Sequence, residues 1–297
     1  VYGIPAEMKY NNLVLINKDM LDEAGLLVPD LNWTWDDYRE YAIKMTKGEG
    51  ADKIYGSFFR SGANIFGINS AKKGNPYFND DGTLTFDEPY FSQFLQWRFD
   101  LEGKDGASVP QADIKALNLN YRDQFFNGKV AMLPLGTYVL SDIGNEKYKH
   151  DFTTTFARMP LWNAEDEHYN AAEATVFSIA RTSEHPQEAF DFLKFWSTEG
   201  VKIKGMFLSN EKDTDRMESI NNIVGDFTDL VDMEALNKVM TDEKWIDSYS
   251  ESTPTYQNEI SNLEKEETDK FLLGAQSLED TVANLMKRGN EIIEANK

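Results

Sequence analysis

Short apolar runs alternate with amphipathic helical patterns along most of this 297-residue chain. The runs at 13–16, 130–134 and 174–180 have the length and composition of buried strands. Helical spacing, with its start and stop residues, predicts helices over 19–24, 35–47, 88–102, 121–127, 186–199 and 277–295. The alternation favours an α/β fold with a mixed sheet flanked by helices on both faces. The length suits one large domain or two modest ones.

Capping residues fix the ends of several predicted helices. Thr34 precedes the helix at 35–47, and Asp37 stands where a capping box needs an acceptor side chain. Pro186 opens the helix at 186–199, and Gly200 is expected just past its end. Its apolar positions, Phe190 among them, are expected to face inward. The segment 209–222 is polar and is expected to be the least structured.

Charge and composition exclude several functions. The chain holds 51 acidic and 30 basic residues, a net charge of -21, which argues against nucleic acid as a partner. Cysteine is absent, so disulfides and thiol nucleophiles are excluded. The three histidines have no metal-binding spacing, and no phosphate loop or nucleophile elbow occurs. A partial calcium-loop match at 77–88 has Tyr77 in place of the first carboxylate, so an ordinary turn is favoured there. We expect no catalysis, no cofactor and no metal.

Loop aromatics beside hydrogen-bonding side chains are the main functional signal. The segment SFFRSGANIFG at 57–67 places Phe66 close to Arg60 and Asn64. Tyr138 follows a predicted strand in PLGTYVL, and Tyr256 lies among Thr, Gln and Asn in STPTYQNEI. Such clusters suit a ligand with apolar faces and a hydroxyl rim, which describes a sugar. Core packing is the alternative for each aromatic taken singly.

Four segments together resemble the bacterial extracellular solute-binding proteins, the family that includes maltose-binding protein. They are VYGIPAEMKYNNLVLINKDMLDEAG, TWDDYREYAIKMT, FFNGKVAMLPLGTY and VFSIARTSEHPQEAFDFLKFWSTEG. The resemblance implies a periplasmic-binding-protein-like fold of type II, with two lobes joined by crossing strands. VYGIP and FSIAR look like those strands. Relatives have a long segment ahead of the first crossing strand, so we expect a processed or truncated chain. Residues 1–182 and 230–297 would then be the C-terminal lobe and 183–229 a remnant of the N-terminal lobe.

The resemblance also implies a set of ligand-binding residues. Tyr138 matches a sugar-stacking position, where relatives more often have Trp. Tyr256 lies near a second stacking position. The 60–66 segment supplies Arg60, Asn64 and Phe66. Lys9 and Tyr10 follow the first crossing strand, where relatives place a polar contact, and Glu173 lies in a turn that is often glycine-rich in relatives.

The function implied is that of a solute-binding component of an ABC importer. Its partners would be a sugar or oligosaccharide and the membrane permease, with no nucleic acid, and the protein would be a monomer. The protein would be extracellular, as a cell-surface lipoprotein in Gram-positive bacteria, or periplasmic. Two alternatives remain open: a binding protein for a polyamine, phosphorylated polyol or peptide, and a carbohydrate-active hydrolase that uses two of the many carboxylates.

Overall fold

Two four-stranded sheets form the centre of the molecule. The computed structural model describes residues 3–11, 13–211, 215–242, 244–248 and 253–296. One sheet has the order β7-β1-β6-β8 and the other β3-β4-β2-β5. The strands are β1 Ile4–Tyr10, β2 Leu13–Asn17, β3 Tyr55–Ser57, β4 Val130–Leu135, β5 Thr154–Arg158, β6 His168–Phe177, β7 Leu208–Ser209 and β8 Trp245–Ser248.

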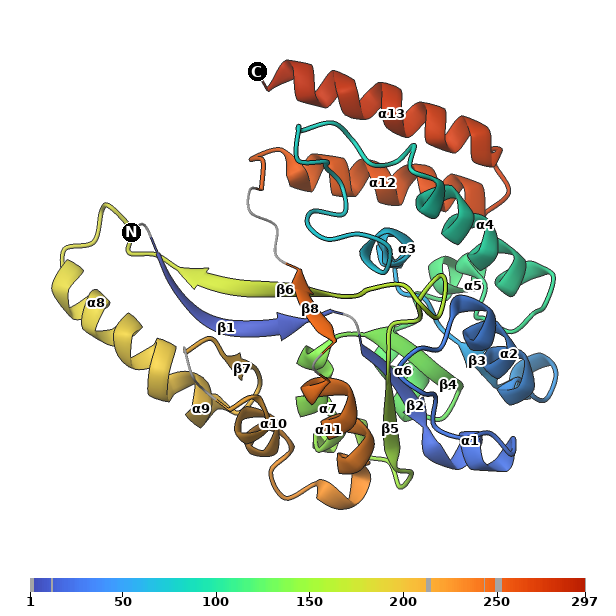
Figure 1. Cartoon of the computed structure of the whole chain (residues 1–297), viewed down its shortest axis with the longest axis horizontal. Helices are drawn as coiled ribbons and strands as arrows, with labels where there is room; N and C mark the ends of the chain where they lie inside the picture. The colour runs from blue at the N-terminus through green and yellow to red at the C-terminus, as the bar shows by residue number, and fades with distance from the viewer. Residues whose placement is uncertain (1–2, 12, 212–214, 243, 249–252, 297) are drawn as a thin grey trace.

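Helices surround both sheets (Figure 1). They are α1 Lys18–Glu23, α2 Trp35–Met45, α3 Phe66–Asn69, α4 Pro89–Gly103, α5 Gln111–Ala116, α6 Tyr121–Phe126, α7 Leu140–Ile143, α8 Pro186–Phe195, α9 Val201–Lys204, α10 Arg216–Val224, α11 Met233–Thr241, α12 Gln257–Leu272 and α13 Leu278–Ala295. Within the described ranges, none of these helices has the length and apolar character needed to cross a bilayer.

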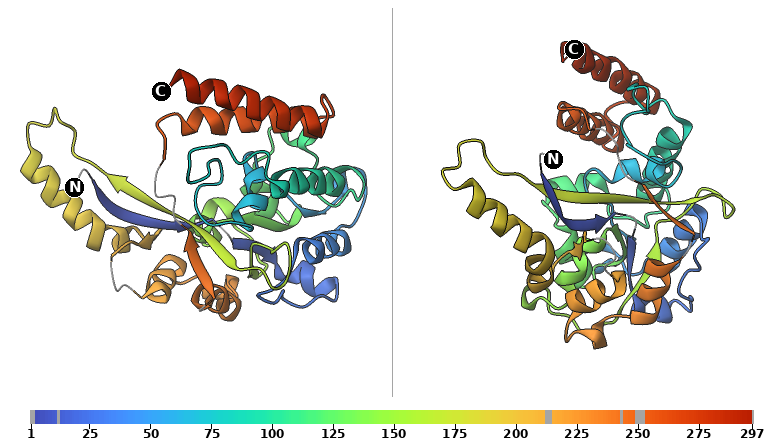
Figure 2. Two further views of the ribbon diagram at one scale, coloured as in Figure 1. Left: turned by 45° about the horizontal axis from the view of Figure 1, so that its top comes forward. Right: turned by 60° about the vertical axis from the view of Figure 1, so that its left-hand side comes forward.

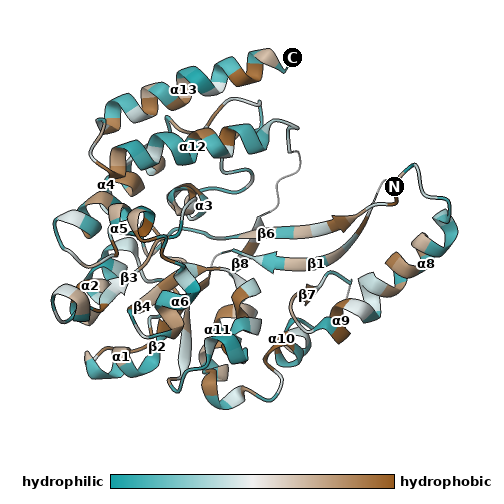
Figure 3. Ribbon diagram, turned by 180° about the vertical axis from the view of Figure 1, so that it is seen from behind, coloured by the Kyte–Doolittle hydropathy of each residue, from teal (hydrophilic) through white to brown (hydrophobic). Residues whose placement is uncertain are grey.

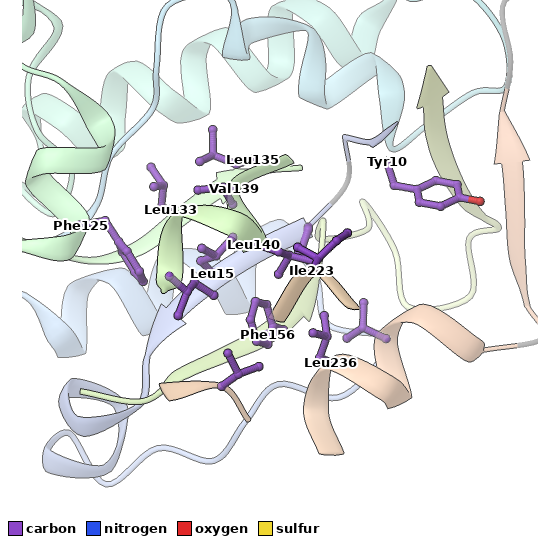
Figure 4. Close-up of a cluster of buried hydrophobic side chains, with 14 of the residues drawn as sticks. Tyr10, Leu15, Phe125, Leu133, Leu135, Val139, Leu140, Phe156, Ile223 and Leu236 are labelled. Carbon is purple, nitrogen blue, oxygen red and sulfur yellow. The ribbon is translucent and has the colours of Figure 1, made fainter. Parts of the chain in front are cut away.

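The sheet built around β2 is covered on both faces. β2 pairs antiparallel with β4 and with β5, and β3 joins β4 in parallel. Because successive strand residues point to opposite faces, Leu15 belongs to one core cluster and Ile16 to the other. Figure 4 shows Leu15 in the first cluster beside Phe156. The predicted mixed sheet with helices on both faces is confirmed.

The second sheet is a long ribbon of β1 and β6. These strands are far apart in sequence but pair antiparallel, from Ile4 opposite Phe177 to Tyr10 opposite Ala172. β8 adds to β6 in parallel. The ribbon extends away from the β2 sheet toward α8 (Figures 1 and 2). The two segments expected to be crossing strands therefore lie side by side where the structure describes them.

A helical layer of α4, α12 and α13 covers the other end of the molecule (Figure 2). Its core includes Phe91, Ile260 and Leu285, each fully buried. Gly289 of α13 lies so close to this core that an added Cβ would come 2.5 Å from Leu84 Cδ1. We call α4, α12 and α13, with the 60–69 segment that packs on them, the helical layer.

Most local predictions are confirmed, and three are wrong. The capping box of Thr34 and Asp37 is present at the start of α2. Gly200, expected past a helix end, lies within a π-helical turn that leads into α9, and its added Cβ would meet the Trp196 ring at 2.7 Å. The polar segment 209–222 contains the start of α10, which Asp215 caps.

The apolar face of α8 does not face inward. None of its residues is buried, and Phe190 is 45% exposed. The spacing correctly predicted an amphipathic helix, but it could not show whether a partner surface lies against that face.

Candidate functional site

A cavity of about 700 Å³ lies between the loop at 60–77, strand β6 and the first turns of α12. Its wall combines aromatic rings, amides, hydroxyls and a few charges. The members that bear on function are Arg60, Phe66, Asn69, Asn75, Tyr77, Glu173, Gln257, Asn258, Ser261 and Lys265. This mixture of apolar surface and sparse polar groups is typical of small-molecule sites.

Hydrogen bonds hold the loop of this cavity against α12. Asn75 Nδ2 donates to Gln257 Oε1 at 2.6 Å, and the hydroxyls of Tyr77 and Ser261 are 3.1 Å apart. Burial raises the pKa of Tyr77, so its hydroxyl stays neutral. The wall is therefore held in place before any ligand arrives, which lowers the entropy lost on binding.

A buried polar network lies directly behind the wall, in the helical layer. Asn64 Nδ2 donates to Glu264 Oε1 at 3.0 Å, and Asn64 Oδ1 accepts from Arg98 Nη1 at 2.7 Å. Arg98 Nε in turn donates to Glu102 Oε1 at 2.7 Å. Burial raises the pKa of Glu264 to about 7, although hydrogen bonds from Asn64 and Thr268 oppose that shift. Both the oxygen and the nitrogen of the Asn64 amide are thus hydrogen-bonded within the protein, and Asn64 is only 2% exposed.

Tyr138 is the middle residue of a short 3₁₀ turn, Thr137–Val139, after β4. The ring is half-buried, and Arg122 lies over it at 5.8 Å. Burial raises the pKa of Tyr138 to about 12, against an opposing effect of the positive charge on Arg60. Gly136 permits the chain to pass close to β1, because an added Cβ would come 2.4 Å from Tyr10 O. Tyr138 is thus close enough to Arg60 for the charge of Arg60 to affect its pKa, but it is not among the described residues that line the cavity.

The other two tyrosines have different surroundings. Tyr10 is 4% exposed and lines a neighbouring cavity of about 200 Å³, with Arg216 stacked over its ring at 4.8 Å. Figure 4 shows Tyr10 at the edge of the core cluster. Tyr256 is half-buried, packs edge-on against Phe78, and directly precedes the cavity residue Gln257.

The structure brings together several of the predicted site residues. Arg60, Phe66 and Glu173 line one cavity, although Phe66 is only 2% exposed. Lys9 pairs with Glu173 at 3.7 Å from the neighbouring strand.

Sequence reasoning missed the contribution of α12. Gln257, Ser261 and Lys265 recur every fourth residue, so they share one helix face. This polar stripe is a signal that could have been recognised in the sequence.

The fold and cavity define an α/β protein built to bind a small solute. Residues 2–203, more than half of the chain, match the bacterial extracellular solute-binding protein family, and the chain belongs to that family. Members of this family are substrate-binding proteins rather than enzymes, and they work outside the cytoplasmic membrane.

Solved structures show the same fold. An ABC substrate-binding protein of Listeria monocytogenes, in complex with cycloalternan, aligns with a TM-score of 0.76 and 20% identity over 99% of this chain and 72% of that one. The sugar-binding protein MalE of Xanthomonas citri aligns at 0.69 and 17% identity, over 99% and 71%. UgpB of Mycobacterium tuberculosis, in complex with glycerophosphocholine, aligns at 0.72 and 15%, over 100% and 71%. The fold is therefore that of the type II periplasmic-binding-protein-like proteins.

Proposed function

We propose that this chain binds a sugar or oligosaccharide in the 700 Å³ cavity and delivers it to the permease of an ABC importer. The cavity itself carries the proposal. Its amides and hydroxyls can pair with sugar hydroxyls, and Ile65 and Val176 supply accessible apolar surface. Several of the solved relatives are sugar-binding proteins, which is consistent with this ligand class.

The predicted residues take different roles in this proposal. Arg60 and Glu173 are hydrogen-bonding groups at the ligand, with Lys9 holding Glu173 in place. Tyr138 and Tyr256 are stacking surfaces just outside the described wall, Tyr138 near Arg60 and Tyr256 next to Gln257. Asn64 and Tyr10 support the wall from behind, because both are almost fully buried.

The proposed lobes follow the crossing strands. Residues 1–182 and 230–297 would form the C-terminal lobe, and 183–229 would belong to the N-terminal lobe. The β1–β6 ribbon supports this division, because it leads from the β2 sheet to α8. The binding protein would act as a monomer, tethered to the cell surface by a lipid or free in the periplasm.

A substitution at Tyr138 tests the stacking role. In the full-length protein, Tyr138→Ala should weaken binding of the sugar ligand by about 1 to 3 kcal/mol, because a ring platform is lost. A thermal-shift screen of mono- and oligosaccharides, polyamines, phosphorylated polyols and peptides selects the ligand. Titration calorimetry then compares the two proteins.

The matched control is Tyr41→Ala, which removes a half-buried tyrosine of α2 that does not line the cavity. It should leave affinity unchanged. If Tyr138→Ala lowers the melting temperature sharply while affinity stays the same, Tyr138 is a core residue. If the screen detects a polyamine or peptide and no carbohydrate, the sugar assignment is wrong.

A further inference from the structure

Two cations in the cavity wall have no carboxylate partner. Arg60 and Lys265 both line the cavity. In the described part of the chain, no ion pair joins either of them to a carboxylate, whereas five other arginines each form one: Arg39, Arg98, Arg122, Arg158 and Arg288. In a chain with 51 acidic residues and a net charge of -21, two unpaired cations in one cavity are unexpected.

The backbone that follows Arg60 passes close to the Lys265 side chain. Gly62 turns the chain two residues after Arg60, with φ at +79°, and a Cβ added there would come 3.3 Å from Lys265 Cε. Arg60 Nε is moreover a buried donor that lacks a hydrogen-bond acceptor among the described residues. A buried donor without an acceptor is costly, so this wall favours an incoming acceptor.

Two carboxylates of the described residues, Glu173 and Glu264, lie at or behind this wall, and neither forms an ion pair with Arg60 or Lys265. Glu173 is paired with Lys9 at 3.7 Å across the β1–β6 ribbon. Glu264 lies behind the wall, with Oε1 bonded to Asn64, and its raised pKa of about 7 leaves it partly protonated near neutral pH. The charged residues of the described cavity wall are thus two cations, Arg60 and Lys265, and one carboxylate, Glu173, which leaves a net positive wall on a strongly negative protein.

We propose that the ligand of this cavity is an acidic carbohydrate, whose anionic group is bound by Arg60 and Lys265. This inference rests on the proposed function and narrows its ligand class. An arginine fork can bind a carboxylate with two hydrogen bonds, and an ammonium group adds a second charge-assisted bond. Asn69, Gln257 and Asn258 line the same cavity and offer amide groups to the ring hydroxyls. A uronic acid and a sugar phosphate both present such an anion.

Paired ligands test this inference on the full-length protein. Calorimetry would compare oligogalacturonate and oligoglucuronate with their methyl esters, which keep size and hydroxyls but lose the charge. Glucose 6-phosphate and glucose form the phosphate arm, and maltose is a neutral reference.

We expect an acidic member to bind at least tenfold tighter than its neutral partner, and the arm that shows this identifies the anion. Neutral sugars binding as well as or better than every acidic partner would overturn the inference and leave the proposed function standing. Binding of no carbohydrate at all would reject both.

Variants assign the effect to the two cations. Arg60→Gln and Lys265→Gln should each weaken binding of the acidic probe at least tenfold, and should reduce its dependence on salt concentration. Neutral-probe affinity should change far less. Lys287→Gln, on an exposed position of α13 outside the cavity, is the matched control and should change neither. Among the described residues, the Arg60 side chain makes a single hydrogen bond, to Ser61 O, so the fold should survive, and the melting temperature verifies this. Unchanged acidic-probe affinity in both variants would contradict the proposal.

Discussion

Helices α8 and α13 carry similar amphipathic patterns but have opposite surroundings. In α13, Leu285 is fully buried against α12 and the loop at 84. In α8 no side chain is buried, and Phe192 and Phe195 are 58% and 48% exposed. Figure 3 shows apolar residues along α8 at the edge of the molecule. An amphipathic pattern therefore specifies a face that needs cover, and the rest of the fold decides what covers it.

The attachment of α8 explains how the exposed helix persists. Its continuation, α9, is fixed to β1 by an ion pair between Lys204 Nζ and Glu7 Oε1 at 3.0 Å. Trp196 stacks on Phe192 and meets Phe177 of β6 edge-on. A few contacts at one end replace the continuous core that stabilises α13. Three substitutions test this contrast.

The largest effect is expected in the helical layer, at Arg98. Arg98→Ala should lower the free energy of unfolding by about 3 to 5 kcal/mol, because it leaves the buried Glu102 carboxylate without its partner. Urea unfolding measures the change. Arg181→Ala, at an exposed position just before α8, is the control and should change the free energy by less than about 0.5 kcal/mol. A loss below about 1 kcal/mol for Arg98→Ala would show that the helical layer does not depend on this network.

A medium effect is expected from Glu264 and depends on pH. Its pKa is about 7 in the folded protein against an ordinary value of 4.5, so the folded state binds the proton more tightly. The contribution of Glu264 to the free energy of unfolding is greatest below about pH 4.5. It decreases by about 3 kcal/mol in total as the pH rises toward 7. Because glutamine resembles the neutral acid, the Glu264→Gln variant should have a higher free energy of unfolding than the natural protein at pH 8. The difference should be much smaller at pH 5.

Glu266→Gln on the same helix is the matched control for that pH dependence. Arg288 and Lys270 hold the pKa of Glu266 at about 2, so it stays ionised from pH 5 to 8. Its substitution should give the same stability difference at both pH values. Equal differences for Glu264→Gln at pH 5 and 8 would show that Glu264 does not titrate in this range.

The smallest effect is expected in α8. Phe192→Ser should change the free energy of unfolding of this chain by less than about 0.5 kcal/mol, because the ring is exposed, and should lower the binding of an apolar fluorescent dye. Leu285→Ala in α13 is the paired change and should cost about 2 to 5 kcal/mol. A loss above 1 kcal/mol at Phe192 would show that another surface covers α8 in solution.

Part of the candidate site could be predicted from sequence. The loop at 60–66 and Glu173 were identified because their residue types suit a polyhydroxylated ligand and their segments resemble a family. The sequence placed Asn64 and Arg60 together, yet only the structure separates them: Arg60 lines the cavity, whereas Asn64 is engaged by Arg98 and Glu264 behind it. Lys265 was missed because it joins this loop from a helix some 200 residues later in the sequence.

Local patterns by themselves determined several strands and the capped helices, because periodicity and end residues act over a few neighbouring positions. The family was indicated by the resemblance of four segments. Tertiary structure decided which apolar faces are buried, which polar groups are satisfied, and that two cations share one cavity wall. The physical reason is that burial and charge pairing depend on residues that only chain folding brings together. Phe192 and Leu285 show this for apolar faces, and Arg98 and Arg60 show it for charges.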